Sequence, residues 1–146
     1  IIGVTEELSA QDIYQLGKEI EPFAIASGTR MGHVHLSVKK SREASVFYQE
    51  SLGLEDKFTI PHASWIASGD YHHHLAVNEW GGKNLVRRKN GMVGLAYYVV
   101  EVENKEFLVN LFTQAQDWQE QLRWISSSEF SVTDKDGIVT RVRVEN

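Results

Sequence analysis

The stretch Gly69–Trp80, GDYHHHLAVNEW, is the most informative part of this chain, because three consecutive histidines occur in a segment that otherwise has the composition of a strand. Side chains alternate between the two faces of a strand. That alternation places His73 with Tyr71, Leu75 and Val77 on one face, and His72 with His74, Ala76 and Asn78 on the other. The pattern therefore separates His73 from its two neighbours.

A second histidine segment, Gly32–Val38, reads GHVHLSV and alternates in the same way. His33 and His35 share one face, and the intervening aliphatic side chains share the other. Two strands that each carry histidines suggest a metal site. Taken singly, a histidine is more often a hydrogen-bonded structural or surface residue than a ligand. We therefore interpret His35, His72 and His74 as structural or surface residues.

The composition is that of one globular domain, with 146 residues of which 42% are hydrophobic. The formal net charge of -5 argues against general nucleic-acid binding, which needs a clustered excess of lysine and arginine. No apolar run is long enough to cross a bilayer, so we expect a cytoplasmic protein without a membrane partner. Because the chain has no cysteine, a transition metal would be held by imidazole and carboxylate groups.

Residues 1–29 predict a short helical arm. Ser9 is a candidate N-cap, and Ile13, Leu16 and Ile20 follow it at helical spacing. Pro22 is expected to end this helix. Residues 30–146 form the predicted domain.

The domain repeats one order of elements, strand, helix, strand, strand, strand. In its first unit a helix over 41–51 stops at Gly53, and strands are expected over 31–38, 54–60, 63–68 and 70–79. In its second unit a strand over 95–102 precedes a helix that Asn104 caps. The turn Asp134–Gly137 then closes a final hairpin, 130–132 against 139–144. We therefore predict an α+β fold of two tandem βαβββ units, linked by a solvated basic loop over Gly81–Gly91.

These segments resemble the vicinal oxygen chelate superfamily, which contains glyoxalases, bleomycin-resistance proteins and extradiol ring-cleaving dioxygenases. The chain looks most like the second domain of catechol 2,3-dioxygenase-like proteins, and the resemblance covers residues 30–146. It rests on GHVHL, on the helix segment ASVFY leading to Leu52-Gly53-Leu54, on GDYHHHLAVNEW, on Gly94-Leu95 and on Asp134–Gly137. The Tyr-His-His-His run is its specific part.

The resemblance implies that the two units curl into an open barrel with a metal in its concave face. It implies that His33 is the first ligand and His73 the second, in agreement with the alternation described above. Fe(II) or Mn(II) held by two imidazoles and one carboxylate keeps positions open, where a substrate with two neighbouring oxygens can chelate.

The chain departs from this pattern in two places. Counting from Asp134–Gly137, the position of the carboxylate ligand holds Arg141, which has no lone pair to donate and repels a divalent cation. Tyr97 stands where relatives place a histidine in the second unit. Glu145 could replace the missing ligand only with a displacement of about 13 Å along the strand, and a salt bridge to Arg141 or Arg143 is its simpler role.

Two functions stay open on this basis. One is an Fe(II)- or Mn(II)-dependent extradiol dioxygenase that acts on a catechol. In that enzyme His33 and His73 would hold the metal, Tyr97 would hydrogen-bond to the substrate, and His62 would be a base.

The other function, which we favour, is a divergent domain with an incomplete metal site and no cofactor. Arg141 and Arg143 would then bind a small anionic or aromatic molecule, between walls drawn from Trp65, Tyr97 and Trp80. Because the arm over 1–29 resembles the linker between two such domains, we also expect a homodimer or a preceding paralogous domain as partner.

Overall fold

The computed structural model describes residues 7–17, 24–87, 89 and 91–145. The chain divides into two units, Ile1–Gly32 and His33–Asn146. Among the described residues, no helix combines the length and the apolar composition that crossing a membrane would need.

The first unit contains one described helix, α1 (Ala10–Leu16). Ser9 is its N-cap as predicted, because the Ser9 hydroxyl accepts a hydrogen bond from the backbone N–H of Asp12. No residue of α1 is buried. Ile20 and Pro22, which the sequence analysis assigned to this helix and its end, lie outside the described residues.

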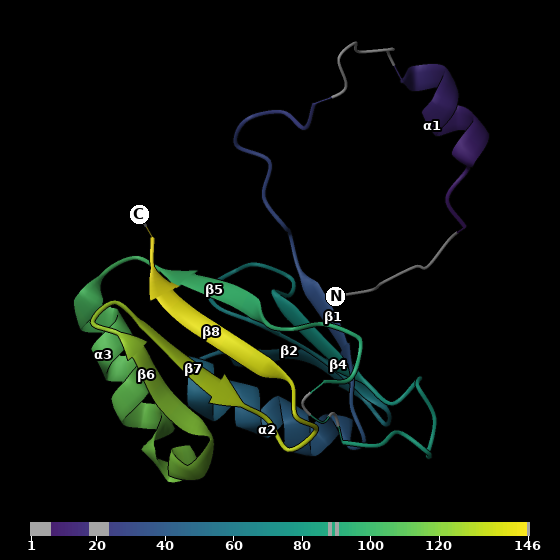
Figure 1. Ribbon diagram of the computed structural model, residues 1–146. Coiled ribbons are helices and arrows are strands. Elements are labelled where there is room, and N and C mark those ends of the chain that lie inside the picture. The colour runs from purple at the N-terminus through teal and green to yellow at the C-terminus, as the bar shows by residue number, and fades with distance from the viewer. Residues whose placement is uncertain (1–6, 18–23, 88, 90, 146) are drawn as a thin grey trace. The chain divides into compact units, whose positions relative to one another are not determined.

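The first half of the second unit is a βαβββ unit (Figure 1). Its elements are β1 (Val34–Ser37), α2 (Ser41–Leu52), β2 (Glu55–Ile60), β3 (Ala63–Ala67) and β4 (Leu75–Asn78). The sheet order is β1-β4-β3-β2, with β1 parallel to β4 and the other pairs antiparallel. Gly53 ends α2 at a φ of 65°, a left-handed conformation that glycine adopts without strain.

The second half repeats this topology. Its elements are β5 (Tyr98–Val102), α3 (Lys105–Gln114), the 3-10 helix η1 (Ala115–Gln121), β6 (Leu122–Ser126), β7 (Glu129–Thr133) and β8 (Val139–Val144). The sheet order is β5-β8-β7-β6, with β5 parallel to β8. Asn104 caps α3 by accepting a hydrogen bond from the backbone N–H of Phe107. The predicted α+β fold of two tandem βαβββ units is confirmed, and the two sheets do not close into one barrel.

One hydrophobic core serves both halves. It contains Leu36, Ile66 and Val77 from the first sheet and Phe130, Val132 and Val142 from the second, packed with α2 and α3 residues such as Phe47, Tyr48, Leu108 and Leu111. Because strand side chains alternate, the residues between these buried positions lie on the opposite face of each sheet, which we call the open face because no helix covers it in the second sheet. On this face of the first sheet Ala63, Ala67, Ala76 and Asn78 are nevertheless buried. In Figure 1 no helix crosses in front of β7 and β8.

A buried carboxylate joins the two halves inside this core. Asp134, at the start of the β7–β8 turn, is only 2% exposed. It accepts hydrogen bonds from the Tyr48 hydroxyl at 2.8 Å and from the backbone N–H groups of Asp136 and Ile138 at 3.0 and 2.8 Å. Burial raises the pKa of Asp134, although these donors act in the opposite direction.

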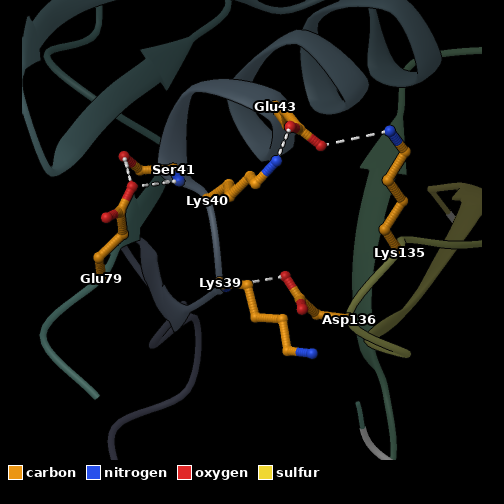
Figure 2. A network of polar contacts seen from close by, with 7 residues as sticks. All are labelled: Lys39, Lys40, Ser41, Glu43, Glu79, Lys135 and Asp136. Carbon is orange, nitrogen blue, oxygen red and sulfur yellow. Dashed lines mark hydrogen bonds and ion pairs between the residues drawn. The ribbon is translucent and has the colours of Figure 1, made fainter. Parts of the chain in front are cut away.

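Exposed polar contacts reinforce the same junction, as Figure 2 shows. The backbone N–H of Lys39, between β1 and α2, donates to a carboxylate oxygen of Asp136 at 3.1 Å. Glu43 of α2 contacts both Lys40 at 2.6 Å and Lys135 of the turn at 3.4 Å. The β7–β8 turn is thereby held against the start of α2.

Three predicted strands are clearly shorter in the structure than in the sequence analysis. The strand expected over 31–38 exists only as β1, so His33 precedes it. The strand expected over 70–79 exists only as β4, and residues 68–74 form turns and bends. The strand expected over 95–102 begins at Tyr98. The alternation argument therefore does not apply to His72, His73 or His74, since none of them lies in a strand.

Candidate functional site

Four histidines gather at the end of the first sheet where β1 and β4 begin. The ring centroid of His33 lies 4.4 Å from that of His73, 5.1 Å from that of His35 and 6.2 Å from that of His72. The Nε2 atoms of His35 and His73 are 3.2 Å apart, so one ring donates a hydrogen bond to the other. The cluster brings His33 and His73 together, as the sequence analysis expected.

The backbone around Gly69 brings the later histidines to this position. Gly69 has a φ of 60°, which lets the chain reverse after β3. The turn is held by the backbone N–H of His74, which donates to the carbonyl of Ile66, and by the N–H of Ser68, which donates to Nδ1 of His74. The N–H of Val34 then donates to the carbonyl of His74. His74 is thus a structural residue of the turn, as expected.

Three of the clustered histidines have the spacing of a metal site. One ring nitrogen from each of His33, His72 and His73 lies within 4.8 Å of the others. Two nitrogen ligands of a tetrahedral zinc ion, each about 2.0–2.1 Å from the metal, lie roughly 3.4 Å apart, so modest side-chain rotations would bring all three onto one ion. The sequence analysis missed His72, because alternation in an assumed strand had assigned it to the other face.

The imidazoles of His35, His73 and His74 favour their neutral forms, because the pKa of each is lowered. Desolvation and the neighbouring histidines, His33 first among them, lower the pKa of His73 to about 4. The pKa of His35 is lowered by desolvation and by His33, and that of His74 by desolvation and by His72. A neutral imidazole has the lone pair that a metal ion requires.

Aromatic side chains lie on the same open face as His35. His35 pairs with Ala76 across β1 and β4, Ala76 pairs with Trp65 across β4 and β3, and Trp65 pairs with Phe58 across β3 and β2. Directly paired residues point to the same side of a sheet. The rings of Trp65 and Phe58 are 5.4 Å apart, and the small Ala76 separates them from the imidazole. Trp65 was an expected wall residue, whereas Phe58 was not.

The second sheet carries the other predicted residues. The guanidinium of Arg141 lies 3.8 Å from the ring centroid of Tyr97, and its Nη1 is 3.4 Å from a carboxylate oxygen of Glu129. Arg143 donates two hydrogen bonds to one oxygen of Glu101, at 3.0 and 2.7 Å. Tyr97 is therefore held by a cation–π contact, and Arg143 already has an anionic partner.

His62 lies at the other end of the first sheet from the histidine cluster. It precedes β3, and its Nδ1 is 3.1 Å from a carboxylate oxygen of Glu79, which follows β4. The other Glu79 oxygen accepts hydrogen bonds from the backbone N–H and the hydroxyl of Ser41, both at 2.9 Å (Figure 2). The four residues of β4 separate Glu79 from His74, roughly 13 Å of strand. The role of His62 as a base stays a prediction.

A cavity of about 190 Å³ lies beside α2, at the junction with the β7–β8 turn. Its lining includes three lysines and three carboxylates, so its charges balance. The charged residues are Lys39, Lys40, Lys135, Glu43, Asp134 and Asp136, and the apolar ones are Ala44 and Phe47. We assign no ligand to this cavity, because most of its charged groups pair with one another or with nearby backbone.

No known protein-family profile matches the chain. Over 87 residues the chain is 33% identical to the catechol-2,3-dioxygenase of Bacillus subtilis (strain 168), and this match covers 58% of the chain. It covers only 30% of the length of that relative. The chain is therefore a homologue of a catechol-2,3-dioxygenase over part of its length.

Solved structures with the same fold come from several bacteria. A glyoxalase/dioxygenase from Nostoc punctiforme aligns with a TM-score of 0.61 over 85% of this chain and 97% of its own, at 15% identity. A lactoylglutathione lyase from Agrobacterium tumefaciens aligns with a TM-score of 0.56 over 82% of this chain and 96% of its own, also at 15% identity. These likenesses confirm the vicinal oxygen chelate fold.

Proposed function

We propose that this chain, with its vicinal oxygen chelate fold and its partial homology to a catechol-2,3-dioxygenase, is a divergent domain that binds a small aromatic molecule without cleaving its ring. The observation that carries the proposal is the place of Arg141, where the resemblance expects a carboxylate ligand. Its guanidinium lies over the Tyr97 ring and next to Glu129. A cation held there disfavours the two-histidine, one-carboxylate site of ring-cleaving relatives.

The histidine cluster supports a metal site of a different kind. His33, His72 and His73 offer three imidazole nitrogen donors, which suit Zn(II), Fe(II), Ni(II) or Cu(II) better than the oxygen-preferring Mn(II). A metal bound there would act as a Lewis acid toward an oxygen atom of the ligand. His35, through its hydrogen bond to His73, would orient that imidazole.

The open face beside this cluster suits a flat ring. A ring stacked against the imidazole of His35 or the indole of Trp65, which flank the buried Ala76, would gain aromatic contacts of about 0.5–1.5 kcal/mol each. An oxygen substituent on that ring could then reach the histidine cluster. The proposed ligand class is therefore a small oxygenated aromatic molecule.

A titration with catechol and with Co(II) tests both parts of the proposal. We expect catechol to shift the NMR signals of the Trp65 indole and of His35, and Co(II) to bind with one equivalent per chain. His72→Ala should weaken Co(II) binding about tenfold or more, whereas His62→Ala, at the other end of the sheet, should not. Catechol that perturbs neither side chain would contradict the aromatic part, and unchanged Co(II) affinity in His72→Ala would contradict the metal part.

Active ring cleavage is a second candidate, which the homology to a catechol-2,3-dioxygenase favours. In it Fe(II) would be held by His33 and His73, with Tyr97 donating a hydrogen bond to the bound catechol. Oxygen uptake by the Fe(II)-loaded protein with catechol separates the two candidates. Catechol-dependent uptake that is lost in both His33→Ala and His73→Ala would establish ring cleavage and overturn the proposal of binding alone.

A further inference from the structure

We propose that Arg123, Ser131 and Arg141 form a carboxylate-binding site on the open face of the second sheet. The proposal rests on the proposed function, because it names the anionic group of the small molecule that this domain binds. It differs from the sequence analysis, which paired Arg141 with Arg143 as the positive element. Arg123 and Ser131 were not candidates there.

The strand register places the three side chains in one row. Arg123 of β6 pairs with Ser131 of β7, and Ser131 pairs with Arg141 of β8. The flanking rows on either side are Leu122–Val132–Thr140 and Trp124–Phe130–Val142, which point toward the helices. Arg123, Ser131 and Arg141 therefore point to the open face. Neighbouring strands are about 4.8 Å apart, so the two arginine backbones lie roughly 10 Å apart with the serine between them.

The contacts on this face hold Arg141 less tightly than Arg143 and leave Arg123 without an ion pair among the described residues. Arg143 is held by two short hydrogen bonds to Glu101. Arg141 has a contact of 3.4 Å with Glu129, longer than the bonds of Arg143, and its guanidinium lies 3.8 Å from the centre of the Tyr97 ring. Arg123 is exposed, and within the described part of the chain it has no ion pair or hydrogen bond.

The charge and the donors of the row fit a carboxylate. The row itself carries two guanidinium groups, those of Arg123 and Arg141, and the nearest carboxylate to it is that of Glu129 in the neighbouring row, 3.4 Å from Arg141. A monoanion suits this row better than a phosphate dianion, because the Glu129 carboxylate repels the higher charge more strongly. The Ser131 hydroxyl, which has no hydrogen-bond partner among the described residues, can donate to a carboxylate oxygen that two guanidinium groups flank.

Benzoate and benzyl alcohol are matched probes for this site, because they share a ring and differ in charge. We expect benzoate to bind about fivefold more tightly than benzyl alcohol at low salt, as measured by NMR titration. Arg123→Gln and Ser131→Ala should each reduce that preference, and Arg123→Gln should shrink it to less than about twofold. Arg42→Gln is the control, since it removes the same charge from an exposed position on α2. It should leave the preference unchanged.

The outcomes separate this inference from the proposed function. Equal binding of benzoate and benzyl alcohol, or an equal loss in Arg42→Gln, would overturn the carboxylate site while leaving aromatic binding intact. If neither aromatic probe binds, the proposed function fails. Titration with acetate then tests the carboxylate site by itself. Acetate should shift the NMR signals of the Arg123 and Arg141 side chains, and Ser131→Ala should make these shifts smaller. If acetate shifts neither signal, the carboxylate site is overturned. Tighter binding of inorganic phosphate than of acetate would overturn the choice of a carboxylate.

Discussion

The two βαβββ halves have the same topology but opposite chemistry on their open faces. The first half places imidazoles beside the rings of Trp65 and Phe58, and the second places arginines among glutamates. Their helix-facing sides are alike, because both contribute aliphatic and aromatic residues to one core. The shared core restricts one side of each strand, whereas the open side tolerates unrelated groups. This division explains how the fold persists while the expected third metal ligand is replaced by Arg141.

The largest predicted effect comes from breaking the buried junction between the halves. Asp134→Ala removes the acceptor of the Tyr48 hydroxyl and of two backbone N–H groups. We expect the free energy of unfolding, measured in urea, to fall by about 2–4 kcal/mol. Asp136→Ala, which removes the contact with the Lys39 N–H, should cost about 1 kcal/mol. An equal decrease in the free energy of unfolding in the two variants would contradict the idea that the buried hydrogen bonds of Asp134 contribute more than the exposed contact of Asp136.

A second experiment transfers a carboxylate to the arginine-bearing half. The substitution Arg141→Glu puts a carboxylate at the position where the resemblance expects the third metal ligand. We predict that Co(II) binds about tenfold more tightly to this variant than to the unchanged chain. Arg143→Glu makes the same change in charge two residues along β8 and should give a smaller gain. An equal gain in Co(II) affinity in both variants would mean that only the net charge of the chain matters. If neither variant gains affinity, the position of Arg141 does not lie close enough to the histidine cluster to share a metal ion with it.

The aromatic character of the first half gives the third prediction. Trp65→Ala should weaken catechol binding about fivefold, which corresponds to about 1 kcal/mol, because one wall of the proposed ring site is lost. Trp80→Ala removes an indole that is 65% exposed and should have little effect. Calorimetry or NMR titration measures both. A larger effect of Trp80→Ala would move the ring site toward the loop after β4.

The smallest predicted effect is the dependence of stability on pH that comes from the histidines of the first half. The lowered pKa values of His35, His73 and His74 mean that the folded state favours neutral imidazoles. Below pH about 6.5 the unfolded chain gains protons first, so stability falls as the pH drops toward about 4. Since these side chains are partly exposed, we expect a total of less than about 1 kcal/mol. Urea unfolding of metal-free protein at several pH values measures this effect. In His73→Gln the free energy of unfolding should depend less steeply on pH between about 6.5 and 4, and an unchanged dependence would contradict the lowered pKa of His73.

Much of the fold could be predicted from local sequence signals. The helix end at Gly53, the cap at Asn104 and the turn Asp134–Gly137 each depend on residues a few positions apart, and all three are confirmed. The end of the β3–β4 connection was predicted less well. Residues 71–74 have strand composition, but the turn at Gly69 and the His74 contacts keep them out of β4.

The candidate site depended more on contacts between distant residues. His33 and His73 are close together in the structure, although their role as metal ligands stays a prediction. His72 could have been found only by allowing for an irregular segment before β4. The pairing of Arg143 with Glu101 joins residues 42 positions apart, and Arg123 joins the row of Ser131 and Arg141 through strand register alone.

The sequence by itself determined the order of the two βαβββ units, their caps and turns, and which strand faces are apolar, because these depend on periodicity and on short-range hydrogen bonds. The tertiary structure decided which histidines share a cluster and which arginines are already neutralised. Both depend on side chains that come together only after strands distant in sequence have paired, and at such distances local pattern carries no information about which groups meet.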